Sequence, residues 1–346
     1  MKGRTILLDD FAGREAAALL VDGRLEDFLV DDPQRARIGA IYRAICDRPL
    51  KGQGGMMVRL PEGETGFLRH GKGLSPGQAL LVQVTGHAED GKAVPMTQRV
   101  LFKSRFAIVT PGAPGLNISR QITDEERRAE LRVLAEEMMP VDGAGLILRS
   151  SCEGADESEI AEDIAAMRDL ADAVLADAEG SIPEALTEGD GPHTLAWREW
   201  TAPADVVTDS GCFETHGVLD ALERLRGPVV PLGEADMTVE TTRALVAVDV
   251  NTRGDTSPAS ALKANLAAAR VLPRELRLRG LGGQVVVDFA PMSKAHRRQL
   301  EQSLRAAFRA DPIESSLVGW TVMGLFEIQR KRERFAVLPI LREGLE

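Results

Sequence analysis

Two short stretches in the last third of the chain, Val246-Ala247-Val248-Asp249-Val250-Asn251 and Val285-Val286-Val287-Asp288-Phe289, decide how this region folds. Each is mostly β-branched and apolar, which is typical of a buried strand, and each carries one aspartate near its end. A buried carboxylate must be paired, hydrogen-bonded or bound to a metal. Two such acids from neighbouring strands would form a divalent-cation site able to activate water against a phosphodiester. The alternative is that each aspartate caps the helix that follows.

Cationic side chains follow both strands. Arg270, Arg274 and Arg277 fall near one face of the helix expected after the first strand. The second strand is followed by Lys294, Arg297 and Arg298. Such cations could contact the phosphates of a polyanion. The alternative is that they lie on solvated helix faces.

Helices and strands alternate through the last third of the chain. Ser257-Pro258 is typical of a helix start, and Pro273 is expected to kink the Ala-rich helix that follows. Four-residue spacing of Leu300, Leu304 and Phe308 predicts the next helix. The other expected elements are a helix at 213–225, strands at 244–250, 284–289 and 317–322, and a basic tail at 329–334. This is an α/β layout.

Length and composition describe an ordinary globular protein. The 346 residues can hold two or three domains, and 44% hydrophobic with 27% charged residues is unremarkable. A net charge of −11 argues against a generally basic nucleic-acid coat but allows a local basic groove. Cys46, Cys152 and Cys212 form no CxxC pair, so a disulfide or a thiolate zinc site is not expected within one chain. No apolar run suggests a membrane span or signal peptide, which predicts a cytoplasmic protein.

The first hundred residues are rich in predicted strands. Three of these strands, with Asp22-Gly23 as a turn, fall at 5–8, 17–21 and 28–30. Five more follow about ten residues apart, at 38–45, 55–60, 66–69, 80–85 and 93–98. This pattern fits a small barrel of the OB type, a frequent nucleic-acid binder. Another small barrel or a hairpin platform would give the same pattern.

The middle of the chain mixes strands and helices. Strands are expected at 106–110 and 145–149, and Thr123-x-x-Glu126 predicts a capping box that opens a helix. An acidic helix then carries its apolar side chains on one face, namely Ile160, Ile164, Met167, Leu170 and Val174. Residues 180–195 are rich in Gly, Pro, Glu and Thr and are predicted to be a linker.

A block of motifs in the last third strongly resembles the catalytic domain of the ribonuclease E/G family. The matching segments are Thr242, Val248-Asp249-Val250-Asn251, Ala264-Asn265-Leu266, Arg274-Glu275-Leu276-Arg277-Leu278-Arg279, Leu281-Gly282-Gly283, Val287-Asp288-Phe289 and Met323-Gly324-Leu325. Weaker matches in family order are Asp22-Gly23 with Leu25, Gly66-Phe67-Leu68, Gly77 with Val82, Ile118-Ser119-Arg120 and Gly145-Leu146-Ile147-Leu148-Arg149-Ser150. The resemblance therefore covers nearly the whole chain.

The resemblance implies a multidomain α/β protein. Its ribonuclease H-like fold would be interrupted by an OB-type β-barrel and a 5′ sensor, and a deoxyribonuclease I-like α/β catalytic domain would follow. The expected borders are 1–35 and 191–224 for the two ribonuclease H-like parts, 36–98 for the barrel, 99–190 for the sensor and 225–346 for the catalytic domain.

The resemblance also implies residue roles. Asp249 and Asp288 match the two metal-binding acids, and Asn251 matches the Asn that holds the first acid and its water. Arg149 and Ser150 match an Arg-Thr pair that grips an RNA 5′-monophosphate, and Ser104 and Ile108 fall where the family completes this pocket with Gly and Val. In the barrel, Phe67 and Lys92 match RNA-contacting positions, and Met57 stands where an aromatic would stack on a base.

Several positions depart from the family pattern. The zinc-binding CPxC element is absent, and the second ribonuclease H-like part is shortened. Arg243, Gly280, Pro291 and Glu314 stand where Glu, Asp, Asp and a basic residue are usual. No zinc is expected, and a monomer or weak homodimer is predicted.

The expected function is a Mg²⁺-dependent endoribonuclease, with Mn²⁺ as another usable cation, that cleaves single-stranded RNA to 5′-phosphate and 3′-hydroxyl ends. The main alternative is an RNA-binding protein of the same fold with little or no nuclease activity, favoured by Met57, Glu314 and the missing zinc element. A weaker alternative is a phosphodiesterase that acts on another nucleotide polymer.

Overall fold

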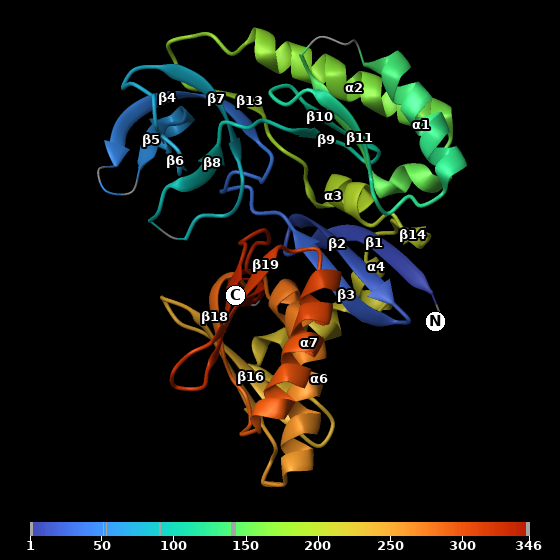
Figure 1. The fold of residues 1–346 in the computed structure, drawn as a ribbon, viewed down its shortest axis with the longest axis vertical. Helices are drawn as coiled ribbons and strands as arrows, with labels where there is room; N and C mark the ends of the chain where they lie inside the picture. The colour runs from blue at the N-terminus through green and yellow to red at the C-terminus, as the bar shows by residue number, and fades with distance from the viewer. Residues whose placement is uncertain (1–2, 51, 53, 90, 140–142, 344–346) are drawn as a thin grey trace. The chain divides into compact units, whose positions relative to one another are not determined.

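The computed structural model describes residues 3–50, 52, 54–89, 91–139 and 143–343 (Figure 1). The chain forms two compact units of mixed α/β structure. The first unit combines the residues up to Asp31 with those from Ala204 onward, and the second unit comprises Asp32–Pro203. Each unit contains two sheets, which are described in turn.

The N-terminal sheet of the first unit has the strand order β14-β1-β2-β3. Its strands are β1 (Arg4–Phe11), β2 (Arg14–Val21), β3 (Arg24–Val30) and β14 (Asp205–Val207). β14 runs parallel to β1, and the other pairs are antiparallel. The predicted turn between β2 and β3 is confirmed, because Asp22 and Gly23 both have positive φ (49° and 75°), as a tight type I′ turn requires.

Short helices pack on this sheet. They are α4 (Cys212–Thr215), α5 (Val218–Glu223), the 3₁₀ turn η3 (Arg224–Arg226) and α8 (Val337–Glu343). The prediction of one helix at 213–225 is wrong, because Gly217 adopts a left-handed φ of 70° and separates α4 from α5. Phe28 and Phe213 meet edge to face in the core beneath these helices.

The second sheet of this unit has the order β15-β16-β17-β18-β20-β19. Its strands are β15 (Val229–Pro231), β16 (Asp236–Thr241), β17 (Val246–Asn251), β18 (Gly283–Asp288), β19 (Ser315–Trp320) and β20 (Phe326–Arg330). β17 and β18 are parallel, while the other neighbouring pairs are antiparallel. The prediction of a basic tail at 329–334 is partly wrong, since its first two residues end β20 and Arg330 is almost fully buried.

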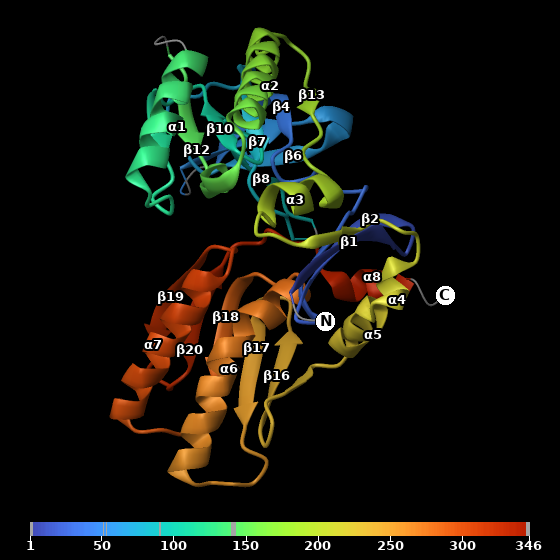
Figure 2. The ribbon, with the colours of Figure 1, turned by 90° about the vertical axis from the view of Figure 1, so that its right-hand side faces the viewer.

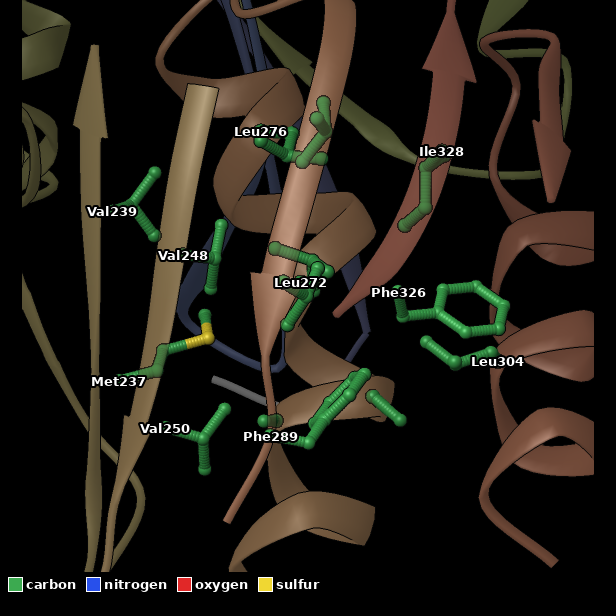
Figure 3. Close-up of a cluster of buried hydrophobic side chains, with 14 of the residues drawn as sticks. Met237, Val239, Val248, Val250, Leu272, Leu276, Phe289, Leu304, Phe326 and Ile328 are labelled. Atoms are coloured by element: carbon green, nitrogen blue, oxygen red, sulfur yellow. The ribbon is translucent and has the colours of Figure 1, made fainter. Parts of the chain in front are cut away.

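Two long helices cover one face of this sheet. α6 (Pro258–Leu278) connects the parallel strands β17 and β18, and α7 (Lys294–Ala310) lies beside it (Figure 2). Alternate residues of the strands, such as Val248 and Val250, meet Leu272, Leu304 and Phe326 in a single apolar core (Figure 3). α6 continues through Pro273, so this proline does not end the helix.

The barrel of the second unit closes on itself. It comprises β4 (Ile41–Leu50), β5 (Gly55–Arg59), β6 (Thr65–Leu68), β7 (Ala79–Val84) and β8 (Val94–Thr97), with η1 (Pro61–Gly63) between β5 and β6. The order is β4-β5-β6-β8-β7, and β7 pairs again with β4, which confirms the predicted five-stranded barrel. The predicted linker at 180–195 is wrong in part, because β13 (Glu184–Thr187) joins the barrel sheet beside β4.

The other sheet of this unit has the order β11-β12-β10-β9, and α1 and α2 pack on it (Figures 1 and 2). The strands of this sheet are β9 (Phe102–Lys103), β10 (Ala107–Thr110), β11 (Gly115–Ile118) and β12 (Gly145–Leu148). The helices of the second unit are α1 (Glu125–Met138), η2 (Ser150–Gly154), α2 (Glu157–Ala176) and α3 (Pro192–Glu199).

Two sequence predictions for these helices need correction. Asp124, not Thr123, is the N-cap of α1, because its carboxylate accepts hydrogen bonds from the Glu126 and Arg127 amides. On α2, Leu170 is exposed and Ala171 is buried in its place.

None of the helices in the described residues is long and apolar enough to cross a membrane. The three cysteines, Cys46, Cys152 and Cys212, are buried free thiols.

Candidate functional site

Asp249 and Asp288 lie directly opposite each other in the sheet of the first unit. They are Cα partners on the parallel strands β17 and β18, which places their backbones about 5 Å apart. Both side chains are exposed, so the expectation of buried carboxylates is wrong. The cause is the alternation of the strands: Val248 and Val287 point into the core, whereas the aspartates point to the face that α6 and α7 leave uncovered.

The capping alternative for the two aspartates is contradicted. Ser257 is the N-cap of α6 and its hydroxyl accepts a hydrogen bond from the Ser260 amide. Ser293 caps α7 in the same way through the His296 amide. Because other residues cap both helices, Asp249 and Asp288 remain available to a ligand on the open face.

The donor set around the two aspartates suits a hard cation that retains water. Asn251 Nδ2 lies 3.4 Å from Asp249 Oδ2, a long hydrogen bond that orients this carboxylate. Within the described part of the chain, no group of three or more His, Cys, Asp or Glu side chains is placed to hold a metal. One or two carboxylates plus several waters is the usual environment of Mg²⁺, whereas zinc sites use three or four protein ligands.

Exposed cations lie near the second aspartate. Lys294 and Arg298 are exposed in the first turns of α7, which begins six residues after Asp288. The Arg297 guanidinium lies over the Trp320 ring at 4.4 Å from its centroid. Phosphate contacts by these three side chains stay a prediction.

Two of the arginines predicted to meet phosphates on α6 have a structural role instead. Arg277 is buried and its guanidinium binds Asp311 (2.5 Å) and Glu26 (2.8 Å). Arg274 donates to the Leu25 carbonyl (2.9 Å), and Arg270 alone stays exposed. Burial works to lower the pKa of Arg277, but its acidic neighbours outweigh burial and raise it. Arg274 and Arg277 are thus occupied by partners from β3 and the loop after α7.

The predicted phosphate pocket of the second unit is only partly assembled. Arg149 Nη1 donates to the Ser104 carbonyl at 2.7 Å, so the structure brings these two residues together. The Ser104 hydroxyl lies 3.1 Å from the Ala107 carbonyl and also bonds Asp163. Ser150 begins η2 directly after Arg149, and Ile108 is half-buried on β10.

Glu199 occupies the other side of Arg149. Its Oε2 accepts from Arg149 Nη2 at 2.6 Å, and its Oε1 accepts from Arg198 Nε at 2.7 Å. Burial raises the pKa of the Glu199 carboxyl, but the charges of Arg198 and Arg149 outweigh this effect and hold the pKa below its ordinary value. Sequence reasoning missed Glu199 because it lies on α3, close after the segment expected to be a linker, and 50 residues from Arg149.

Two of the three residues predicted to contact RNA in the barrel are neighbours. Met57 on β5 and Phe67 on β6 are Cα partners and are both half-buried. The Phe67 ring packs over Gly55, where an added Cβ would overlap the ring. Lys92 is exposed in the loop between β7 and β8 and pairs with Glu89.

Three of the four departures from the family pattern in the catalytic region lie on the surface, whereas Gly280 is half-buried against the Phe335 backbone. Arg243 and Pro291 are exposed, and Glu314 forms an ion pair with Lys331 at 2.5 Å. Because this pair is itself exposed, Glu314 adds little to stability.

Comparison with known proteins identifies the family. The model of the ribonuclease E/G family matches residues 102–210 and 203–333. Ribonuclease E of Nostoc sp. is 26% identical over an alignment that covers 92% of this chain and 54% of that protein. Ribonuclease G of Escherichia coli is 24% identical, with 97% of this chain and 81% of that protein covered. The chain thus spans about half the length of the Nostoc relative. With more than half of its residues matched by the family model, the chain belongs to the ribonuclease E/G family.

Proposed function

We propose that this protein is a Mg²⁺-dependent endoribonuclease that cuts single-stranded RNA and leaves 5′-phosphate and 3′-hydroxyl ends. The observation that carries the proposal is the pairing of Asp249 with Asp288 on the open face of the sheet, inside the region matched by the family model. The names of the relatives, ribonuclease E and ribonuclease G, support RNA as the substrate.

The two aspartates and Asn251 would act together in cleavage. Asp249 and Asp288 supply the anionic ligands for the cation, and the Asn251 amide keeps the Asp249 carboxylate in position. When bound, Mg²⁺ lowers the pKa of its water and neutralises the charge that develops on the phosphate; Mn²⁺ can supply the same chemistry. Lys294 and Arg298 would hold the neighbouring phosphates, because both are exposed near the end of β18.

The finer domain assignments belong to this proposal. The N-terminal sheet with residues 191–224 would be the ribonuclease H-like part, and residues 225–346 the deoxyribonuclease I-like catalytic domain. Residues 36–98 would be an OB-type RNA-binding barrel in which Phe67, Met57 and Lys92 contact RNA. Residues 99–190 would form the 5′ sensor, with Arg149, Ser150, Ser104 and Ile108 around the terminal phosphate.

A second candidate function is RNA binding with little cleavage. It is favoured by one observation in the barrel and one in the sensor. Met57 offers no aromatic face beside Phe67, and Glu199 already holds the guanidinium of Arg149. Weak substrate binding would then limit cleavage even with both aspartates in place.

The deciding experiment measures cleavage of a labelled single-stranded RNA by the whole protein with and without Mg²⁺. Asp249→Asn and Asp288→Asn should each abolish cleavage while RNA binding persists, because one lost anionic ligand leaves too little charge to hold the cation. Glu240→Gln is the matched control. Glu240 is an exposed acid on β16, and its Cα partner, Ala247, lies two residues before Asp249 on β17. Full cleavage by either aspartate variant would refute the proposed cation site. If the unmodified protein bound RNA without Mg²⁺ but did not cleave it, the result would favour RNA binding with little cleavage.

Elemental analysis tests the prediction on zinc, and light scattering tests the prediction on the oligomeric state. A zinc-free protein that is a monomer or a weak homodimer is expected. Stoichiometric zinc, or a loss of mass when a chelator is added, would contradict them.

A further inference from the structure

Trp197 is an unusual surface residue of the second unit. It lies on α3, and 61% of its surface is exposed. Among the described residues, it is the one aromatic side chain in the exposed class. Trp200, three residues later, is buried in the ordinary way. Contacts within the chain thus leave most of this indole open to solvent.

One face of the Trp197 ring is held by Arg105. The Arg105 guanidinium carbon lies 3.9 Å from the ring centroid, and Arg105 Nη1 donates a hydrogen bond to the Trp197 carbonyl. The backbone of Arg105 is fixed in turn, because its carbonyl accepts a hydrogen bond from the Ser151 hydroxyl at 2.5 Å. Since Arg105 covers one face, the exposed surface of Trp197 lies on the opposite face and the edge. The ring is thus presented to solvent in a fixed orientation.

The neighbours of Trp197 belong to the phosphate pocket proposed above. Ser151 follows Ser150 directly, and Arg149 Nη1 donates to the carbonyl of Arg198, the residue after Trp197, at 3.1 Å. Trp197 therefore directly precedes the residue whose carbonyl the Arg149 guanidinium contacts, on the same helix. A nucleotide whose phosphate reached Arg149 would carry its base within the neighbourhood of α3.

We propose that Trp197, backed by Arg105, is a stacking platform for the nucleobase at the 5′ end of single-stranded RNA. This inference rests on the proposed function and adds a recognition element to it. Every base has a π face that can stack on an indole, so such a platform accepts any sequence. The cation–π contact with Arg105 on the far face holds the indole in place for such stacking. A terminal base on Trp197 would also compensate for the partial occupation of Arg149 by Glu199.

The first test measures binding of a ten-nucleotide single-stranded RNA with a 3′ fluorophore by anisotropy, in the Asp288→Asn protein to prevent cleavage. Adding Trp197→Ala should raise the Kd about 5- to 150-fold, the range expected for loss of one stacked base. Trp197→Phe should give a smaller rise, because a ring remains. Val133→Ala is the matched control, as Val133 is an exposed apolar residue on α1 of the same unit.

The second test removes the base instead of the indole. An RNA whose 5′-terminal nucleotide is abasic should bind the protein with Trp197 intact as weakly as natural RNA binds Trp197→Ala. Combining the abasic RNA with Trp197→Ala should raise the Kd no further. RNA should also quench tryptophan fluorescence, and Trp197→Phe should remove that quenching although Trp200 and Trp320 remain. Thermal unfolding followed by circular dichroism checks that each variant is folded.

Two results would overturn the inference, and they can be told apart from failure of the proposed function. An unchanged Kd in folded Trp197→Ala, or equal binding of abasic and natural RNA, would show that the indole serves another contact, while cleavage by the unmodified protein would leave the proposed function intact. Absence of any RNA binding by the Asp288→Asn protein would overturn both proposals.

Discussion

Replacing Glu199 by Gln should sharpen recognition of the RNA 5′-phosphate. Glu199 Oε2 lies 2.6 Å from Arg149 Nη2, where it competes for the donor that a terminal phosphate would use. Gln keeps the shape of the side chain but removes its charge. The Arg149 side chain is 22% exposed and the Glu199 side chain 39%. The pair should therefore contribute about 1 kcal/mol, a value between that of an exposed ion pair and that of a buried charged hydrogen bond. Freeing Arg149 should therefore tighten binding of 5′-monophosphorylated RNA about fivefold.

The assay compares Kd values for one RNA with a 5′-monophosphate and with a 5′-hydroxyl. Glu199→Gln should raise the ratio between them, and Arg149→Ala in the same protein should erase the gain. Glu184→Gln is the matched control, because Glu184 pairs with Arg43 elsewhere in the same unit. An unchanged ratio, or equal tightening for both RNAs, would refute the reasoning, since the effect would then be absent or only a change in net charge.

Acidification is a poorer way to free Arg149. Because Arg198 and Arg149 hold the pKa of Glu199 below its ordinary value against the effect of burial, the carboxylate stays ionised throughout the neutral range. A lowered folded pKa means that the pair contributes stability above the unfolded pKa of about 4.3 and loses it as the pH falls through the folded value. The difference in stability between the unmodified protein and Glu199→Gln should thus be fully present at pH 7 and should shrink as the pH falls below about 4.3.

Two further predictions concern the core and the barrel. Asp311→Ala should lower the free energy of unfolding of the first unit by about 3–5 kcal/mol and its Tm by about 10 °C in calorimetry, because the buried guanidiniums of Arg277 and Arg330 lose the carboxylate that they share. Glu314→Ala breaks only an exposed ion pair and should have almost no effect. Met57→Phe should improve RNA affinity about fivefold or more by adding a stacking face beside Phe67, and a titration with no gain would count against base stacking at this position.

The strands of the catalytic region could be predicted because their signal is local. The β-branched runs that became β17 and β18 are apolar over consecutive positions, and the observed strands lie within two residues of the predicted ranges. β20 has a weaker signal in the sequence, because polar residues alternate with the buried Phe326 and Ile328 and lead into a cationic run. Its buried arginine therefore looked like part of a solvated tail.

The partners of charged side chains could not be predicted from the sequence. Arg277 binds Glu26, which is 251 residues away, and Arg149 binds Glu199 across 50 residues. No spacing rule reaches such distances, so every arginine in the motif block looked equally available to phosphate. The alternation of the strands was visible, yet which face the helices would cover was not, and the aspartates proved exposed for that reason.

The interrupted path of the first unit has a consequence for synthesis of the protein. Thr5 on β1 pairs with Asp205 on β14, so this sheet must wait for about 170 intervening residues to emerge from the ribosome. Those residues form the continuous second unit, which can fold as soon as it has been made. Its folding would replace a long flexible loop by a compact insert and thereby reduce the entropy that closing the sheet requires. Until β14 has been made, the edge of β1 that it covers would stay open to pairing with another chain, so a pause in translation after Pro203 would expose the chain to aggregation.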